Sequence, residues 1–182
     1  MTGLRDLKGT YSIDPAHSSI AFVARHAMIA KVRGTFDKYT STLVLDGDHP
    51  EQSSAEVSID VSSVDTRDAN RDAHLKSPDF FDVEKHPQMT FTSTKVELVD
   101  DQTVNITGDL TIRDVTKPVT IPFNFTGSAV DPFGNQRAGF EGQVTVNRKD
   151  WNLNWNAVLE AGGVLVADKV NLELDVSAIK QA

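Results

Sequence analysis

The stretch RDAHLKSPDFFD, residues 71–82, gathers the side chains that acid–base chemistry uses. It holds His74 together with three carboxylates, among them Asp72. A histidine and paired carboxylates can exchange protons with a bound substrate. The same residue types also suit a helix start, because Asp is favoured at helix N-termini and Arg71 lies nearby to neutralise it. The helical interpretation is the stronger one, so we predict no catalytic residue in this stretch.

Other chemistries lack their residues or their spacing. The chain has no cysteine, which excludes thiolate nucleophiles and cysteine-bound metals. Its five histidines form neither an H-x-H nor an H-E-x-x-H pattern, so we predict no metal site. His17 and Ser18 are neighbours on an expected strand and should face opposite sides, which disfavours a nucleophilic dyad. Gly162-Gly163 precedes a strand instead of joining a strand to a helix, which disfavours a phosphate loop and leaves no expected cofactor.

Charge and hydropathy narrow the partners. Eighteen basic and 26 acidic residues give a formal net charge of -8, which repels nucleic acid and anionic membrane surfaces. No apolar run is long enough to cross a bilayer, so we expect no integral membrane segment. The first residues, MTGLRDLKGTYSID, lack the pattern of a secretory signal. We therefore expect a cytoplasmic protein without a nucleic-acid partner.

Apolar residues alternate with polar ones through most of the chain, which is typical of half-buried strands. The alternating runs are Ile20, Phe22 and Ala24; Ala55, Val57, Ile59 and Val61; Val104, Ile106, Leu110 and Ile112; Val119, Ile121, Phe123 and Phe125; Phe140, Val144 and Val146; and Val164 to Val176. Turn residues separate these runs, and no linker divides residues 1–182, which predicts one all-β domain.

Eight or nine strands are enough to close a sheet into a barrel, although periodicity alone leaves a β-sandwich open. Met89 and Phe91 share one parity while Val96 and Leu98 share the other. A β-bulge near Ser93 or Thr94 would reconcile the two halves of that strand.

Residues 66–82 interrupt the strand pattern and predict a short helical insertion. Asp65 or Thr66 can cap a helix over Arg67 to Lys76. Ser77-Pro78 then predicts a second helix start, with a capping residue followed by proline at the first helical position.

The motifs, taken together and in order, resemble the YceI-like family over nearly the whole chain. The family consists of lipocalin-like barrels that bind polyisoprenoid or other long-chain amphiphilic lipids. The motifs are Tyr11-x-Ile13-Asp14 with His17-Ser18, Gly34-x-Phe36, SSVDTRDANRDAHLKSPDFFD, Pro87-x-x-Thr90-Phe91-x-Ser93, ITGDLTIRDVTKPVT and DPFGNQRAGFE. The resemblance implies an eight-stranded antiparallel barrel with a helical insertion and a deep apolar pocket for an isoprenoid tail. It also implies a homodimer.

Residue by residue, the resemblance and the strand parity agree on eight pocket-lining candidates, and the helical insertion adds two more. The ten are Ile20, Phe22, Phe36, Phe80, Phe81, Phe91, Leu110, Phe123, Phe125 and Phe140. Which of Phe80 and Phe81 points inward is open at this stage. Polar side chains at the pocket mouth, namely Arg71, Asp72 and His74, are candidates to meet a lipid head group.

Three functions compete on this basis. The leading hypothesis is a non-enzymatic carrier or store for a long isoprenoid-like lipid, such as an isoprenoid quinone. The second is an enzyme that acts on a lipid in the same pocket, with His74 or Asp72 as acid or base. The third is an interaction module whose barrel is filled by side chains, since a barrel of this size either fills or admits one small ligand. Trp151 and Trp155 depart from the family pattern, and we expect them to alter the pocket mouth or cover an exterior patch.

Overall fold

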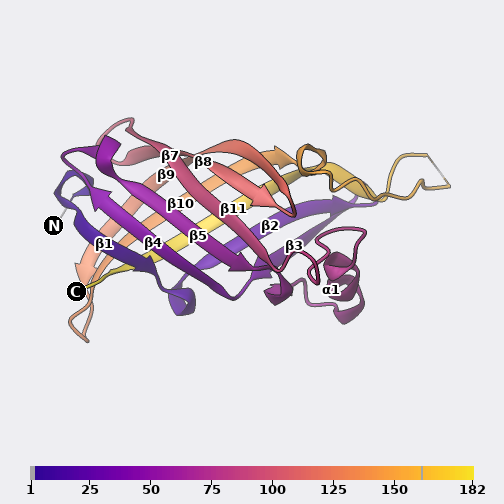
Figure 1. The fold of residues 1–182 in the computed structure, drawn as a ribbon, viewed down its shortest axis with the longest axis horizontal. Coiled ribbons are helices and arrows are strands. Elements are labelled where there is room, and N and C mark those ends of the chain that lie inside the picture. The colour runs from indigo at the N-terminus through magenta and orange to yellow at the C-terminus, as the bar shows by residue number, and fades with distance from the viewer. Residues whose placement is uncertain (1–2, 161) are drawn as a thin grey trace.

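The chain forms a barrel of antiparallel strands with one short helix at one end, seen in the computed structural model of Figure 1. The structure describes residues 3–160 and 162–182. These residues contain eleven strands, one α-helix and five short 3-10 turns. The strands are β1 Lys8–Ile13, β2 Ser19–His26, β3 Ala30–Phe36, β4 Tyr39–Asp46, β5 Ser54–Asp60, β6 Val64–Asp65, β7 Gln88–Leu98, β8 Thr103–Ile112, β9 Val115–Val130, β10 Gln136–Asn147 and β11 Val166–Lys180. The helix is α1 Ala69–Lys76, and the turns are η1 Leu4–Asp6, η2 Pro15–His17, η3 Pro50–Gln52, η4 Val61–Ser63 and η5 Arg148–Trp151.

Eight of the strands close into a ring. Each neighbour in the order β1, β4, β5, β7, β8, β9, β10, β11 is paired antiparallel, and β11 pairs back to β1 through Ile13 and Ala178. Closure removes the sheet edges that an open sandwich would expose. The expected eight-stranded antiparallel barrel is therefore confirmed, and the sandwich alternative is wrong.

The other three strands continue the barrel wall toward α1. Strand β11 pairs with β2 over its first part and with β1 over its last part, so β1 and β2 follow one line interrupted by η2. In the same way β3 and β4 are separated by residues 37–38, and β5 and β6 by η4. Each of these three stretches of the barrel wall is thus interrupted once along the chain. These interruptions explain why the pattern suggested eight or nine strands and the structure divides them into eleven.

Strand β7 carries the expected bulge. Its register with β8 shifts between Ser93 and Lys95, so Thr94 is the extra residue. The shift allows both Phe91 and Val96 to face the barrel interior despite their opposite parity. The predicted bulge is confirmed.

The helical insertion is present, but it begins later than predicted and contains one helix instead of two. Asp68 caps α1, and its carboxylate accepts hydrogen bonds from the amides of Asn70 and Arg71, both at 3.0 Å. Arg67 has a φ of 65°, a left-handed conformation that cannot extend the helix, so neither Asp65 nor Thr66 is the cap. The Ser77-Pro78 pair starts a chain of turns, where Ser77 closes α1 by donating to the His74 carbonyl.

The barrel interior is apolar but loosely filled. Buried side chains form two clusters, one around Tyr11, Phe140 and Ala178 and one around Phe36, Ile112 and Trp151 toward α1. No large side chain in the described residues is completely buried. Native cores usually pack densely, so this pattern indicates internal space. Over the same residues, no helix combines the length and the hydropathy needed to cross a bilayer.

Candidate functional site: an apolar cavity inside the barrel

A cavity of about 300 Å³ runs along the barrel interior and touches both buried clusters. Inward-facing residues in the middle of the barrel, such as Ile20, Val57 and Ile106, stay partly accessible although they lie inside the wall. They are accessible because they face the cavity. The volume lies at the lower end of the range of ligand pockets, about 300–1,000 Å³. A barrel completely filled by side chains, the basis of the interaction-module hypothesis, does not fit this interior.

Nine of the ten predicted pocket residues lie in the cavity lining. They are Ile20, Phe22, Phe36, Phe80, Phe81, Phe91, Leu110, Phe123 and Phe140. Phe125 is the exception: its ring packs against that of Phe140, with centroids 5.6 Å apart, and is absent from the lining. That these residues contact a ligand stays a prediction.

Both phenylalanines of the insertion reach the cavity. Phe81 packs edge-on against Phe36, with ring centroids 5.9 Å apart. Phe80 is buried and also packs against Trp155, at 5.5 Å, and against His74, at 5.1 Å. The insertion therefore closes this end of the barrel with two rings, and the choice between Phe80 and Phe81 does not arise.

The three head-group candidates lie outside the lining. The hydroxyl of Thr66 donates to Asp72 at 2.6 Å and accepts from Nε of Arg71 at 2.8 Å. Nη2 of Arg71 also donates to the Thr66 carbonyl, so these residues fasten the turn before α1. His74 Nε2 pairs with Asp79 at 2.9 Å, and its ring stands edge-on to Trp155. We singled out these residues as head-group contacts by their residue types. In the structure, each of them bonds to a neighbouring residue of the insertion.

Arg148 is a buried cation in the cavity lining that sequence reasoning did not single out. Its side chain is 5% exposed, and its nitrogens donate to the backbone carbonyls of Ala167, Trp155, Val166 and Leu153. Burial lowers the pKa of this guanidinium, and Asp168 at 3.8 Å opposes the shift. Lys149 beside it is exposed, so the sequence RK contains no signal of which cation is buried.

The two tryptophans have different roles. Trp151 is buried in the lining, and its indole nitrogen donates to the carbonyl of Leu110 at 2.8 Å, which ties η5 to β8. Trp155 packs on the side of Phe80 and His74 and is absent from the lining. Of the two tryptophans that depart from the family pattern, one therefore lines the pocket and the other makes an aromatic contact outside it.

At the other end of the barrel, Leu4 and Leu7 reach the cavity from η1 and the residue after it. The backbone there is fixed because Gly47 donates its amide to the Leu7 carbonyl at 2.8 Å. Three polar residues, Asp46, Ser53 and Ser54, belong to the lining at this end. These residues carried no pattern that marked them as lining.

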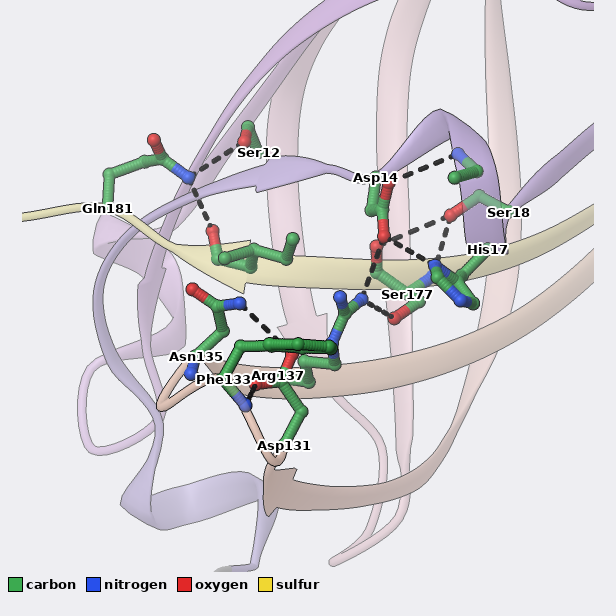
Figure 2. Close-up of polar contacts among 12 residues, drawn as sticks. Ser12, Asp14, His17, Ser18, Asp131, Phe133, Asn135, Arg137, Ser177 and Gln181 are labelled. Carbon is green, nitrogen blue, oxygen red and sulfur yellow. Dashed lines mark hydrogen bonds and ion pairs between the residues drawn. The ribbon is translucent and has the colours of Figure 1, made fainter.

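Two distant sequence motifs meet on the barrel exterior, near η2 and the β9–β10 turn (Figure 2). Arg137 donates to Asp131 at 2.7 Å and to Asp14 at 2.9 Å. The hydrogen bond from Arg137 is the main cause that lowers the pKa of Asp14 and holds the pKa of Asp131 far below its usual range. His17 bonds to Asp14, whereas Ser18 bonds to the backbone of Ser177, so His17 and Ser18 serve different structural partners.

The cavity can bury an apolar ligand, and its ionisable groups are already hydrogen-bonded to the protein. Its ionisable lining residues, Arg148 and Asp46, are at opposite ends and are occupied by hydrogen bonds to backbone groups. Across the described parts of the chain, no three His, Asp or Glu side chains come together as a metal ion would require. The arrangement can therefore hold an elongated apolar molecule with its polar end near either barrel end.

Comparison with known proteins agrees with this architecture. The family model for the YceI-like domain matches residues 11–178. Protein YceI of Escherichia coli O157:H7 is 41% identical over 145 residues, which cover 79% of this chain and 75% of that protein. The crystal structure of Burkholderia cenocepacia BcnA superposes with a TM-score of 0.80 at 26% identity, covering 91% of this chain and 98% of that one. A domain of Saccharophagus degradans, described as polyisoprenoid-binding, shares the fold with a TM-score of 0.72 at 15% identity, covering 94% and 98%. With a cavity-bearing barrel and a family match over most of its length, the chain belongs to the YceI-like family.

Proposed function

We propose that this protein binds a long-chain, isoprenoid-like lipid inside the barrel without catalysing a reaction, and stores or transports it. The apolar cavity carries this proposal, because apolar burial is the only strong interaction that its lining offers. The Saccharophagus degradans domain, described as polyisoprenoid-binding, motivates the choice of isoprenoids as probes.

The affinity follows from the area removed from water. Each buried methylene group contributes about 0.8 kcal/mol, so about ten of them supply about 8 kcal/mol before the cost of association. Before that cost is subtracted, this free energy corresponds to a dissociation constant of about 1 μM. The favourable part of binding thus needs no charged contact and grows with the length of tail that is buried, and specificity for an isoprenoid quinone or alcohol would come from the shape of the lining.

The decisive experiment is organic extraction of freshly purified protein followed by mass spectrometry. We expect a long-chain lipid in the extract and binding of added isoprenoid quinones or alcohols by the delipidated protein. Recovery of no lipid, together with no binding of either added class, would overturn the proposal.

A matched pair of variants makes this experiment specific to the cavity. Replacing Ile106 and Leu172 together by Trp adds two large rings where the wall faces the cavity, and it should abolish lipid recovery. Replacing Val99 by Trp adds the same ring to an exposed loop position and should leave recovery unchanged. Circular dichroism of both proteins establishes that the barrel is folded.

Lipid turnover separates this function from an enzyme. We expect the wild-type protein and its His74→Ala and Asp72→Ala variants to yield the same lipid species in the same amounts, because both side chains lie outside the cavity lining. Loss of a lipid product in either variant would favour the enzyme. The cytoplasmic location and the homodimer stay predictions, which cell fractionation and analytical ultracentrifugation can test.

A further inference from the structure

Two chain segments form a projecting tip at the α1 end of the barrel. One is the turn between β2 and β3, and the other consists of residues 157–160 and 162–165, which extend beyond those strands in Figure 1. The amide of Ala27 donates to the Leu165 carbonyl at 2.7 Å, and Val158 and Val164 form a β-bridge. We call the side chains of Met28, Ile29, Val158 and Val164 the apolar tip.

The apolar tip is exposed to solvent. Ile29 is 82% exposed, Val158 85%, Met28 63% and Val164 38%. The described residues include eight exposed large hydrophobic side chains, and four of them are in this tip. Single exposed apolar side chains are ordinary, but a group of them indicates a contact surface.

The turn that presents the tip is unfavourable as an isolated turn. Ile29 donates its amide to the His26 carbonyl, and Ala27 and Met28 between them have φ values of 52° and 63°. Four-residue β-turns with positive φ at both central positions strongly favour Asn and Gly there. A long apolar side chain at Met28 therefore opposes the local backbone preference, and the turn keeps it exposed.

The charges on the β2–β3 side of the tip are opposite in sign to the net charge of the molecule, whereas Glu160 on the other segment is acidic. Arg25 and Lys31 are exposed and lie directly opposite each other on β2 and β3, a like-charge pair that destabilises a hairpin. Residues 15–36 contain no Asp or Glu, although the net charge of the chain is -8. Within the described residues, neither Arg25 nor Lys31 has a carboxylate in ion-pair distance, whereas Arg33 farther along β3 pairs with Glu173. Arg25 donates to the carbonyl of Ile29 at 3.2 Å, so no carboxylate neutralises either charge beside the tip.

The tip is also continuous with the cavity wall. Ala24 and Val166 line the cavity, and each lies within a few residues of the tip along β2 and β11. A surface that covers the tip would therefore lie next to the α1 end of the cavity.

We propose that the apolar tip docks the protein on a membrane surface that contains anionic lipids. The apolar side chains would enter the interfacial layer, and Arg25 and Lys31 would meet lipid phosphates, the pattern of a membrane-surface anchor. A symmetric contact with a second copy fits less well, because it would bring the same cations together. The far-field repulsion expected from the net charge is opposed locally by the cations at this end. The proposal does not require the barrel to hold a lipid.

The test is flotation of the full-length protein with phosphatidylcholine vesicles, with and without phosphatidylglycerol. We expect the wild-type protein to float with the vesicles, and more strongly when phosphatidylglycerol is present. Replacing Arg25 and Lys31 together by Gln should remove that preference for anionic vesicles.

Variants in the turn separate docking from stability. Ala27→Asn combined with Met28→Gly supplies the residues that the turn prefers, so the melting temperature should rise while vesicle binding falls about tenfold or more. Ile29→Thr keeps the branched shape and should also weaken binding. Phe133→Asn is the matched control, because Phe133 is 88% exposed in the β9–β10 turn, away from this tip, and its loss should leave binding unchanged.

The proposal is overturned if the wild-type protein floats with neither vesicle, or if the turn variants bind as well as the wild-type protein. It is also overturned if Phe133→Asn reduces binding equally, or if ultracentrifugation finds a dimer that depends on Ile29 in a protein that does not float. Tip-dependent flotation of a protein that yields no lipid on extraction would refute only the proposed function.

Discussion

At the scale of single residues, Arg148 is the clearest case of a charged side chain that stabilises the cavity wall through hydrogen bonds to the backbone. Its guanidinium donates to carbonyls of Leu153 and Trp155, between η5 and β11, and to those of Val166 and Ala167 at the start of β11. A planar group with five donors can satisfy several carbonyls at once, which a lysine cannot. The cation is therefore part of the wall that the apolar guest would face.

Replacing Arg148 by Met should lower the free energy of unfolding by about 3–5 kcal/mol, because several buried carbonyls lose their donors. Lys149→Met is the matched control, since Lys149 is exposed, and it should change stability by less than about 0.5 kcal/mol. Urea denaturation followed by circular dichroism measures both. Equal stability of the two variants would contradict the role given to Arg148.

The Arg137 cluster predicts a pH dependence of stability. The pKa values of Asp14 and Asp131 are lowered in the folded protein, chiefly by hydrogen bonds from Arg137. A carboxylate with a lowered folded pKa stabilises the protein above its unfolded pKa, about 3.9, and this stabilisation is lost as the pH falls through the folded pKa.

Asp131→Asn should therefore lower the melting temperature most at neutral pH. The difference from the wild-type protein should shrink as the pH falls below about 4, because the unfolded wild-type chain then takes up a proton that its folded form resists. Thermal melts over a pH series measure this difference. A difference that stays constant down to strongly acidic pH would refute the assignment.

At the scale of elements, the bulge in β7 keeps two halves of one strand facing the same cavity. Without the extra residue, a one-residue slip would turn either Phe91 or Val96 outward. The bulge thus belongs to the construction of the cavity.

Deletion of Thr94 should prevent stable folding, because one half of β7 must then expose its apolar residues. Thr94→Gly keeps the residue count and should leave a folded barrel, since the Thr94 side chain is exposed. Near-ultraviolet circular dichroism and resistance to proteolysis distinguish the two proteins. A well-folded deletion variant would show that the register tolerates the loss.

At the scale of the whole molecule, the barrel interior contains a cavity where most proteins have a densely packed core. A ligand that binds only the folded state adds stability by mass action. An as-purified, lipid-loaded protein should therefore melt at a higher temperature than the same protein after delipidation.

At a free ligand concentration of about 100 times the dissociation constant, the gain is about 2.7 kcal/mol, or about 5–11 °C for a chain of this size. Scanning calorimetry before and after delipidation measures the shift. The variant with Trp at positions 106 and 172 should show none, because its cavity is filled. Identical melting temperatures for loaded and delipidated wild-type protein would contradict occupancy of the barrel.

Sequence reasoning succeeded where local periodicity decides the outcome. Strand parity placed residues such as Phe22 and Phe123 on the inner face, and a parity change located the bulge near Thr94. It was less successful where a partner distant in the chain, or a competing local contact, decides. Arg148 is buried by carbonyls up to 19 residues away, and Leu4 reaches the cavity from a terminal turn. Near α1, the cap at Asp68 was missed because Arg67 adopts a left-handed backbone that no side-chain pattern signals.

The position of Leu4 and Leu7 gives the cavity a fixed depth. These side chains occupy the end opposite the α1 insertion, where the backbone contact to Gly47 holds them. At the opposite end the rings of Phe80 and Phe81 close the cavity, so the space between the two ends has a limited length. A guest lying along the barrel would have to fit between these two sets of side chains, and the barrel would then act as a ruler that selects its guests by length.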